Sequence, residues 1–273
     1  MGQALPVSFL SPAEDALARA FVDDGVVMFP VEDRDPLERI QGTIADLAAR
    51  HLGIAERGPA TAFLDTVHKR VDVAGLNDLR LAVINGLNQA PWVREAYFRL
   101  GRRALETIVG NELVMQRRLN LSIQLPDDDS SLLPLHADVW SGDSPFEVVL
   151  WTPLVDCRKT KAMFLLPPAA NARAEARMAD FQGQGVEALY RAIEPELSWC
   201  EIPFGQAMIF TQNLMHGNRV NREPETRWSI NCRFKSVFSP YSGKRLGEFF
   251  EPITLRPATR VGMAYRLPTG FAE

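Results

Sequence analysis

Two histidines and an aspartate stand at a spacing that can hold a metal ion. His136 and Asp138 are separated by one residue, and His216 follows eighty positions after the first histidine. Alternate residues of a β-strand point to one side, so a strand over residues 135–139 would direct His136 and Asp138 toward one ion. A strand-like apolar run, residues 207–210, can deliver His216 from a neighbouring strand. Two imidazoles and one carboxylate can occupy one face of an octahedral iron(II) ion and leave three positions open.

Arg227 and Ser229 form a second group that could bind a small molecule. Both would lie on one face of a strand, and a planar guanidinium can bind a carboxylate through two hydrogen bonds. The pair therefore suits the far carboxylate of a small diacid. Arg222 lies in the turn formed by residues 221–224 and Arg219 lies beside it, which predicts surface positions for these two arginines.

The iron(II)- and 2-oxoglutarate-dependent dioxygenases have a signature of H-x-D, a distal histidine, then R-x-S. The sequence resembles this signature, in the same order, at His136, Asp138, His216, Arg227 and Ser229. Residues 20–27 and 150–156 resemble the phytanoyl-CoA dioxygenase-like branch, and the likeness spans roughly residues 8–240. The stretch 136–156 is also similar to a subgroup of bacterial carbohydrate biosynthesis. The phytanoyl-CoA dioxygenase-like branch often has an acidic-Asn-Gly turn, and this sequence has Lys-Thr-Lys at residues 159–161 instead. No substrate contact is therefore carried over from that turn.

The resemblance implies an enzyme that oxidises an unactivated C–H bond. It implies Fe(II) bound by His136, Asp138 and His216, 2-oxoglutarate as cosubstrate held by Arg227 and Ser229, and O2 as the oxidant. The substrate would be a small molecule, and a sugar or sugar nucleotide of a biosynthetic pathway is favoured. The alternative is the same chemistry on an acyl-CoA or a natural-product intermediate, with hydroxylation, desaturation or cyclisation as the outcome.

Two other classes of protein compete with this interpretation. Zinc hydrolases also use two histidines and a carboxylate, but they need a general base, and the H-E-x-x-H motif that usually supplies it does not occur in this sequence. The H-x-H arrangement of cupins is also absent. A non-catalytic sensor of 2-oxoglutarate or metal would be favoured by loss of a ligand, and all three are present.

Two rows of alternating polar residues predict the wall of a cavity. Asn231 and Arg233 continue the row of Arg227 and Ser229, and four polar residues on one face of a barrel strand are unfavourable unless that face is wet or ligand-filled. A second row of alternating polar residues contains Asn120, Ser122 and Gln124. This row either faces solvent or faces the same cavity. We expect Gln124 in this row to contact the cosubstrate. The residues expected to contact the substrate are Asn120, Ser122, Trp140, Asn231 and Arg233.

The pattern of elements predicts a mainly β fold with flanking helices, a double-stranded β-helix (jelly roll) barrel buttressed by N-terminal α-helices. Helices are expected from the Ser11 cap to about Asp23, from the Asp35 cap to Gly53, and from Pro91 to Gly110. Runs with a period of two predict strands over residues 25–30, 117–125, 133–140, 146–154, 162–166, 197–202, 206–211 and 227–237. We expect a single domain over residues 1–273. It comprises a helical buttress to about 112, a barrel to about 240 with a helical insertion at about 167–196, and a C-terminal extension, 241–273.

Composition limits the possible partners. The 273 residues carry a formal charge of −4, so a broad basic surface for nucleic acid is not expected. No apolar run is long enough to span a bilayer, and residues 1–6 contain no cationic leader or myristoylation pattern, so we expect no membrane association and a cytoplasmic location. Three widely spaced cysteines, Cys157, Cys200 and Cys232, predict buried thiols rather than disulfides.

Overall fold

Two antiparallel β-sheets form the centre of the computed structural model, which describes residues 9–270 and therefore does not include the N-terminal residues considered above. In the large sheet the strand order is β1 (Val26–Pro30), β7 (Gln206–Thr211), β4 (Val148–Pro153), β9 (Arg227–Ser236), β2 (Leu113–Gln116) and β10 (Phe250–Pro252), and β3 (Asn120–Gln124) also pairs with β9. The small sheet has the order β6 (Ser198–Cys200), β5 (Met163–Leu165) and β8 (His216–Gly217). The predicted fold class, mainly β with flanking helices, is confirmed.

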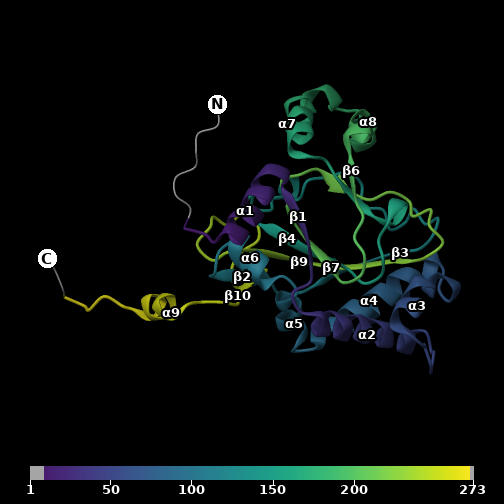
Figure 1. The fold of residues 1–273 in the computed structure, drawn as a ribbon, viewed down its shortest axis with the longest axis horizontal. Coiled ribbons are helices and arrows are strands. Elements are labelled where there is room, and N and C mark those ends of the chain that lie inside the picture. The colour runs from purple at the N-terminus through teal and green to yellow at the C-terminus, as the bar shows by residue number, and fades with distance from the viewer. Residues whose placement is uncertain (1–8, 271–273) are drawn as a thin grey trace.

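Helices lie on the outer sides of both sheets, whereas α9 (Pro257–Ala264) stands apart from them near the C-terminus (Figure 1). The N-terminal helices are α1 (Pro12–Asp24), α2 (Arg34–His51), α3 (Ala60–Asp65), α4 (Val73–Gln89), α5 (Val93–Arg99) and α6 (Arg102–Ile108), with the 3-10 turn η1 (Val67–Lys69). On the opposite side lie α7 (Pro168–Ala176), η4 (Met178–Phe181), α8 (Val186–Ile193) and η5 (Glu194–Glu196). The remaining elements are η2 (Asp138–Ser141), η3 (Lys159–Lys161) and α9 (Pro257–Ala264). None of the described helices is long and apolar enough to cross a bilayer.

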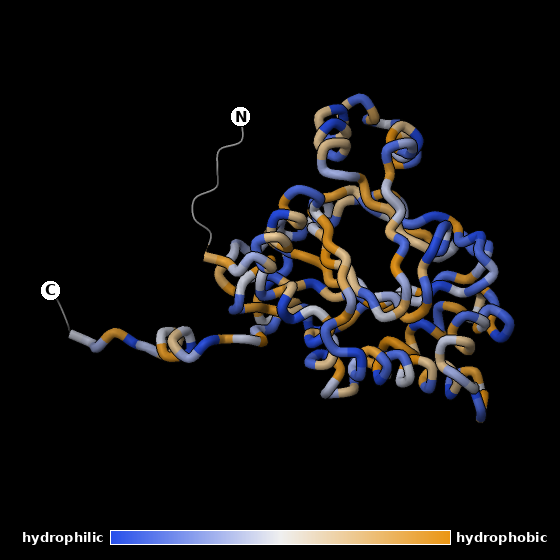
Figure 2. Tube along the Cα trace, in the orientation of Figure 1, coloured by the Kyte–Doolittle hydropathy of each residue, from blue (hydrophilic) through white to orange (hydrophobic). Residues whose placement is uncertain are grey.

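Three apolar clusters hold these layers together. Ile230, Cys232 and Phe234 of β9 point away from the interior and pack against the N-terminal helices. Val149, Trp151 and Met208 of the large sheet meet Met163 and Leu165 of the small sheet in the space between the sheets. In Figure 2 the central strands are largely apolar, while hydrophilic residues gather in the peripheral loops and helices. The site described below therefore lies between two sheets that helices support from outside.

The insertion between β5 and β6 is helical, as predicted, and it packs on the outer face of the small sheet. Ala170 and Ala174 of α7 and Leu189 of α8 share a buried cluster with Phe164 and Met215. No described residue of α7 or α8 lines the cavity between the sheets. The helices consequently support the strand that carries His216 instead of covering the cavity.

Three expectations about local structure need correction. The predicted strand over residues 133–140 does not form, because Asp138 begins the 3-10 turn η2 and only His136 makes an isolated bridge. The predicted helix 91–110 is divided between α5 and α6 at Gly101, where an added Cβ would lie 3.0 Å from the ring of Phe29. The helix expected to begin after Asp35 begins at Arg34, with Asp33 as the N-cap residue. The capping box at Ser11 and the three buried, unpaired cysteines are confirmed.

Candidate metal and cosubstrate site

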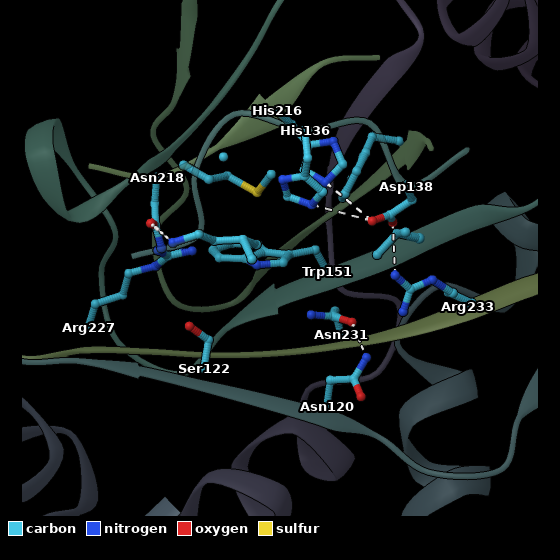
Figure 3. Close-up of a pocket in the computed structure, with 15 residues that line it drawn as sticks. Asn120, Ser122, His136, Asp138, Trp151, His216, Asn218, Arg227, Asn231 and Arg233 are labelled. Carbon is cyan, nitrogen blue, oxygen red and sulfur yellow. Dashed lines mark hydrogen bonds and ion pairs between the residues drawn. The ribbon is translucent and has the colours of Figure 1, made fainter. Parts of the chain in front are cut away.

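The structure brings His136, Asp138 and His216 together between the sheets (Figure 3). Nε2 of His136 lies 3.4 Å from Oδ1 of Asp138, and Nε2 of His216 lies 4.0 Å from the same oxygen. One ligand atom from each residue falls within 4.8 Å of the others. His136 and His216 are also joined by two backbone hydrogen bonds, of 3.0 and 2.7 Å, which fix their relative positions. The predicted strand was wrong, but the bridge and the following turn still produce the arrangement that it was expected to provide.

Backbone carbonyls orient both imidazoles. Nδ1 of His136 lies 2.8 Å from the carbonyl oxygen of Pro134, and Nδ1 of His216 lies 2.8 Å from that of Leu214. A proton on each Nδ1 satisfies these carbonyls and leaves the Nε2 lone pairs free to bind a cation. The local geometry thus selects the tautomer that a metal site needs.

The electrostatics favour the metal-binding protonation states of Asp138 and His216. Although burial would raise the pKa of Asp138, its contacts with His136 and Arg233 hold that pKa well below its usual range. Burial lowers the pKa of His216 to about 4, and the neighbouring His136 acts in the same direction. Burial would also lower the pKa of His136, but its hydrogen bonds to Asp138 and Pro134 outweigh that effect and raise it. At neutral pH the site therefore offers an ionised carboxylate and a neutral His216.

A cavity of about 220 Å³ opens beside the three ligands. Val149, Trp151, Met163 and Phe210 are among the apolar residues of its lining. The polar part includes Asn120, Ser122, Asn218, Arg227, Asn231 and Arg233. The candidate metal ligands and the hydrogen-bonding groups therefore face the same cavity.

Arg227 is buried in this cavity and has no anionic partner among residues 9–270. Its residue is only 3% exposed, and its Nε and Nη1 atoms make no hydrogen bond to the described residues. The neighbouring thiol of Cys157 does not compensate its charge, because burial raises the pKa of that thiol to about 11. The hydroxyl of the fully buried Ser229 also has no partner within the described chain. Unsatisfied buried polar groups are unfavourable, so this end of the site fits a carboxylate ligand.

The register of β3 against β9 explains how the two polar rows meet. Asn120, Ser122 and Gln124 lie opposite Asn231, Ser229 and Arg227, respectively. Residues directly opposite in neighbouring strands share a face of the sheet. Asn120 confirms the contact by donating a hydrogen bond of 2.9 Å to Asn231. Asn120 and Ser122 of the second row line the cavity, whereas Gln124 does not.

Three of the residues predicted for the site, Gln124, Ser229 and Trp140, are not among those that line the cavity. Trp140 is 43% exposed, because it lies in η2 and not on the predicted strand. Gln124 is buried but does not line the cavity, and its amide donates to the carbonyl of Arg219 at 2.7 Å. Arg233 lines the cavity, but its guanidinium is bonded to Asp138 and Gln212. Its predicted contact with the substrate stays a prediction.

Sequence reasoning missed Trp151 and Asn218 as parts of the cavity. Trp151 lies opposite Asn231 in the pairing of β4 with β9, so it shares the interior face. All six residues of β4 are buried, so alternation of polarity could not show which ones face the site. Asn218 follows His216 by two residues, and that spacing is the one signal that could have placed it on the same side.

Comparisons with known proteins show the same fold in non-heme oxygenases. No protein-family model matches the sequence, and no curated protein matches it at a significant level. The non-heme monooxygenase ThoJ, in a nickel complex, is 17% identical with a TM-score of 0.56, and the match covers 93% of this chain and 89% of that chain. EctD from S. alaskensis, with 2-oxoglutarate and 5-hydroxyectoine, is 16% identical with a TM-score of 0.56 over 85% of this chain and 78% of that chain.

The site's own chemistry agrees with a metal and a diacid. Two imidazole nitrogens and a carboxylate oxygen are a ligand set that suits iron(II) and leaves positions open. The unpaired guanidinium of Arg227 lies in the same cavity as these ligands. Iron(II) and 2-oxoglutarate therefore fit the residues that are present.

Proposed function

We propose that this protein is an iron(II)- and 2-oxoglutarate-dependent oxygenase that oxidises a C–H bond of a small polar metabolite. One observation carries the proposal: a complete triad of metal ligands shares a cavity with a buried arginine that has no anionic partner. A zinc hydrolase would use the triad but would give no role to the unpaired guanidinium. The structure of EctD with 2-oxoglutarate adds support from a protein of the same fold.

Different residues of the chain would bind the metal and the cosubstrate and exclude water. His136, Asp138 and His216 would hold iron(II), and Arg227 with Ser229 would bind the far carboxylate of 2-oxoglutarate. The chemistry supplied by iron(II) and 2-oxoglutarate would be the reduction of O2, with one oxygen atom entering succinate, the other entering the substrate, and carbon dioxide released. The apolar side of the cavity, which includes Trp151 and Phe210, would keep water away from the reacting groups.

The polarity of the cavity favours a hydroxylated or anionic substrate. Asn120, Asn231, Ser122 and Asn218 all line it, whereas lipid ligands are held in predominantly apolar pockets. The Nδ2 group of Asn231 makes no hydrogen bond to the described residues, although its Oδ1 accepts one from Asn120. A free donor at this position suits a substrate hydroxyl or phosphate oxygen. We therefore favour a sugar or sugar nucleotide over an acyl-CoA.

The substrate class can be tested by measuring succinate formation from 2-oxoglutarate. A panel of sugars and sugar nucleotides should stimulate succinate release, and long-chain acyl-CoA thioesters should not. Asn231→Leu should raise the KM for the stimulating compound and leave the affinity for 2-oxoglutarate unchanged. Stimulation by acyl-CoA alone would overturn the substrate class, and absence of metal-dependent 2-oxoglutarate binding would overturn the reaction itself.

The three free thiols support a cytoplasmic location for this chemistry. Cys157, Cys200 and Cys232 are buried and unpaired, as expected in a reducing compartment. Such a compartment also keeps iron in its divalent state. Localisation of a tagged full-length chain by cell fractionation tests this part of the proposal.

A further inference from the structure

Arg233 contacts the one metal-binding carboxylate in the site. We propose that Arg233 is a positioning residue, which fixes the carboxylate of Asp138 so that Oδ1 faces the two imidazoles. The inference rests on the proposed function, because it concerns the same metal. It also explains why a partly buried arginine lies next to a cation-binding site.

The two oxygens of Asp138 have separate partners. Nη2 of Arg233 donates to Oδ2 at 2.9 Å, whereas Oδ1 is the oxygen near Nε2 of His136 and of His216. Figure 3 shows the guanidinium and the imidazoles on different sides of this carboxylate. A carboxylate held through one oxygen cannot rotate freely about its Cβ–Cγ bond. The contact therefore presents the other oxygen in a constant direction.

Arg233 is itself fixed by buried neighbours. Its Nε donates to Oε1 of Gln212 at 2.8 Å and lies 3.4 Å from Oδ2 of Asp143. Gln212 is fully buried and donates to Glu147 at 2.8 Å, and Asp143 also pairs with Lys244. These groups come from several loops and strands. The guanidinium is thus a rigid link between the metal ligand and the rest of the fold.

Positioning and simple electrostatics predict opposite effects of removing this arginine. A positive charge near a bound cation repels it, so electrostatics alone predicts tighter metal binding after the charge is removed. If Arg233 fixes the ligand instead, its removal weakens binding, since loss of groups that orient metal ligands typically reduces affinity about 10–100-fold. The sign of the change in affinity separates the two roles.

The experiment measures the dissociation constant of Mn(II) for metal-free full-length protein by electron paramagnetic resonance. Arg233→Met should weaken binding about tenfold or more. Arg233→Lys, which keeps the charge but loses the planar fork, should also weaken it. Gln212→Leu keeps the charge of Arg233 but removes the hydrogen bond that holds its guanidinium. It should therefore weaken Mn(II) binding by a smaller factor. Arg222→Met is the matched control, because Arg222 is an exposed arginine paired with Asp127.

Circular dichroism and thermal unfolding would establish that each variant is folded. Unchanged or tighter Mn(II) binding by folded Arg233→Met would overturn the positioning role. Wild-type affinity in Arg233→Lys together with weaker binding in Arg233→Met would also overturn it, because a point charge would then suffice. Failure of the wild-type protein to bind metal would instead refute the proposed function, so the two failures are distinguishable.

Discussion

Replacement of Arg227 by methionine should greatly weaken the binding of 2-oxoglutarate. Methionine keeps much of the side-chain volume and removes the guanidinium, whose Nε and Nη1 atoms have no partner among the described residues. Hydrogen bonds to charged groups contribute about 1.5–3 kcal/mol each, so two such bonds to the cosubstrate correspond to about 3 kcal/mol or more. Since 1.4 kcal/mol is tenfold in affinity, the dissociation constant should rise by about two orders of magnitude or more.

The assay is anaerobic calorimetric titration of the metal-loaded protein with 2-oxoglutarate. Arg227→Lys should give an intermediate affinity, because it keeps the charge but cannot form the bidentate contact. Arg222→Met should match the wild-type protein, since Arg222 lies at the surface. Normal affinity in folded Arg227→Met, or a larger loss in Arg222→Met, would show that the wrong arginine was assigned to the cosubstrate.

Three further predictions concern the metal ligands, the surface and the core. His136→Ala and His216→Ala should abolish stoichiometric iron binding, measured by metal analysis, with circular dichroism unchanged; undiminished iron would refute their assignment. Trp140→Ala should leave kcat/KM for 2-oxoglutarate within about twofold of the wild-type value, because surface substitutions generally have small effects. A tenfold loss would show that Trp140 belongs to the site. Tyr97→Phe should lower the free energy of unfolding by about 1–3 kcal/mol, because the buried hydroxyl donates to two backbone carbonyls of the large sheet; denaturant unfolding with no loss of stability would contradict this role.

The parts of the site that depend on short-range spacing were predictable from the sequence. Arg227, Asn231 and Arg233 face one cavity because β9 is a regular strand and its alternation is local. His136 and Asp138 were predicted on a strand, and the short spacing still brings their ligand atoms together although the chain turns into η2. The residue types and their order therefore indicated which three side chains come together, even where the backbone conformation differed.

The parts that depend on distant contacts were not predictable. The pairing of β3 with β9 joins residues more than one hundred positions apart, and this register decides which polar row faces inward. The bond from Arg233 to Asp138 also connects distant segments, so alternation alone predicted a substrate contact. Gly101 separates α5 from α6, and a Cβ at this position would lie 3.0 Å from the ring of Phe29, a neighbour about which a helical pattern contains no information.

The central claim is that one metal and one 2-oxoglutarate bind together in this cavity. The most direct test is an anaerobic titration of the metal-free protein with iron(II) and then with 2-oxoglutarate, followed by visible absorption. A charge-transfer band that saturates at one iron and one 2-oxoglutarate per chain, and that requires both His216 and Arg227, is the predicted result. Binding of 2-oxoglutarate without metal dependence, or the absence of such a band in the folded protein, would contradict the account.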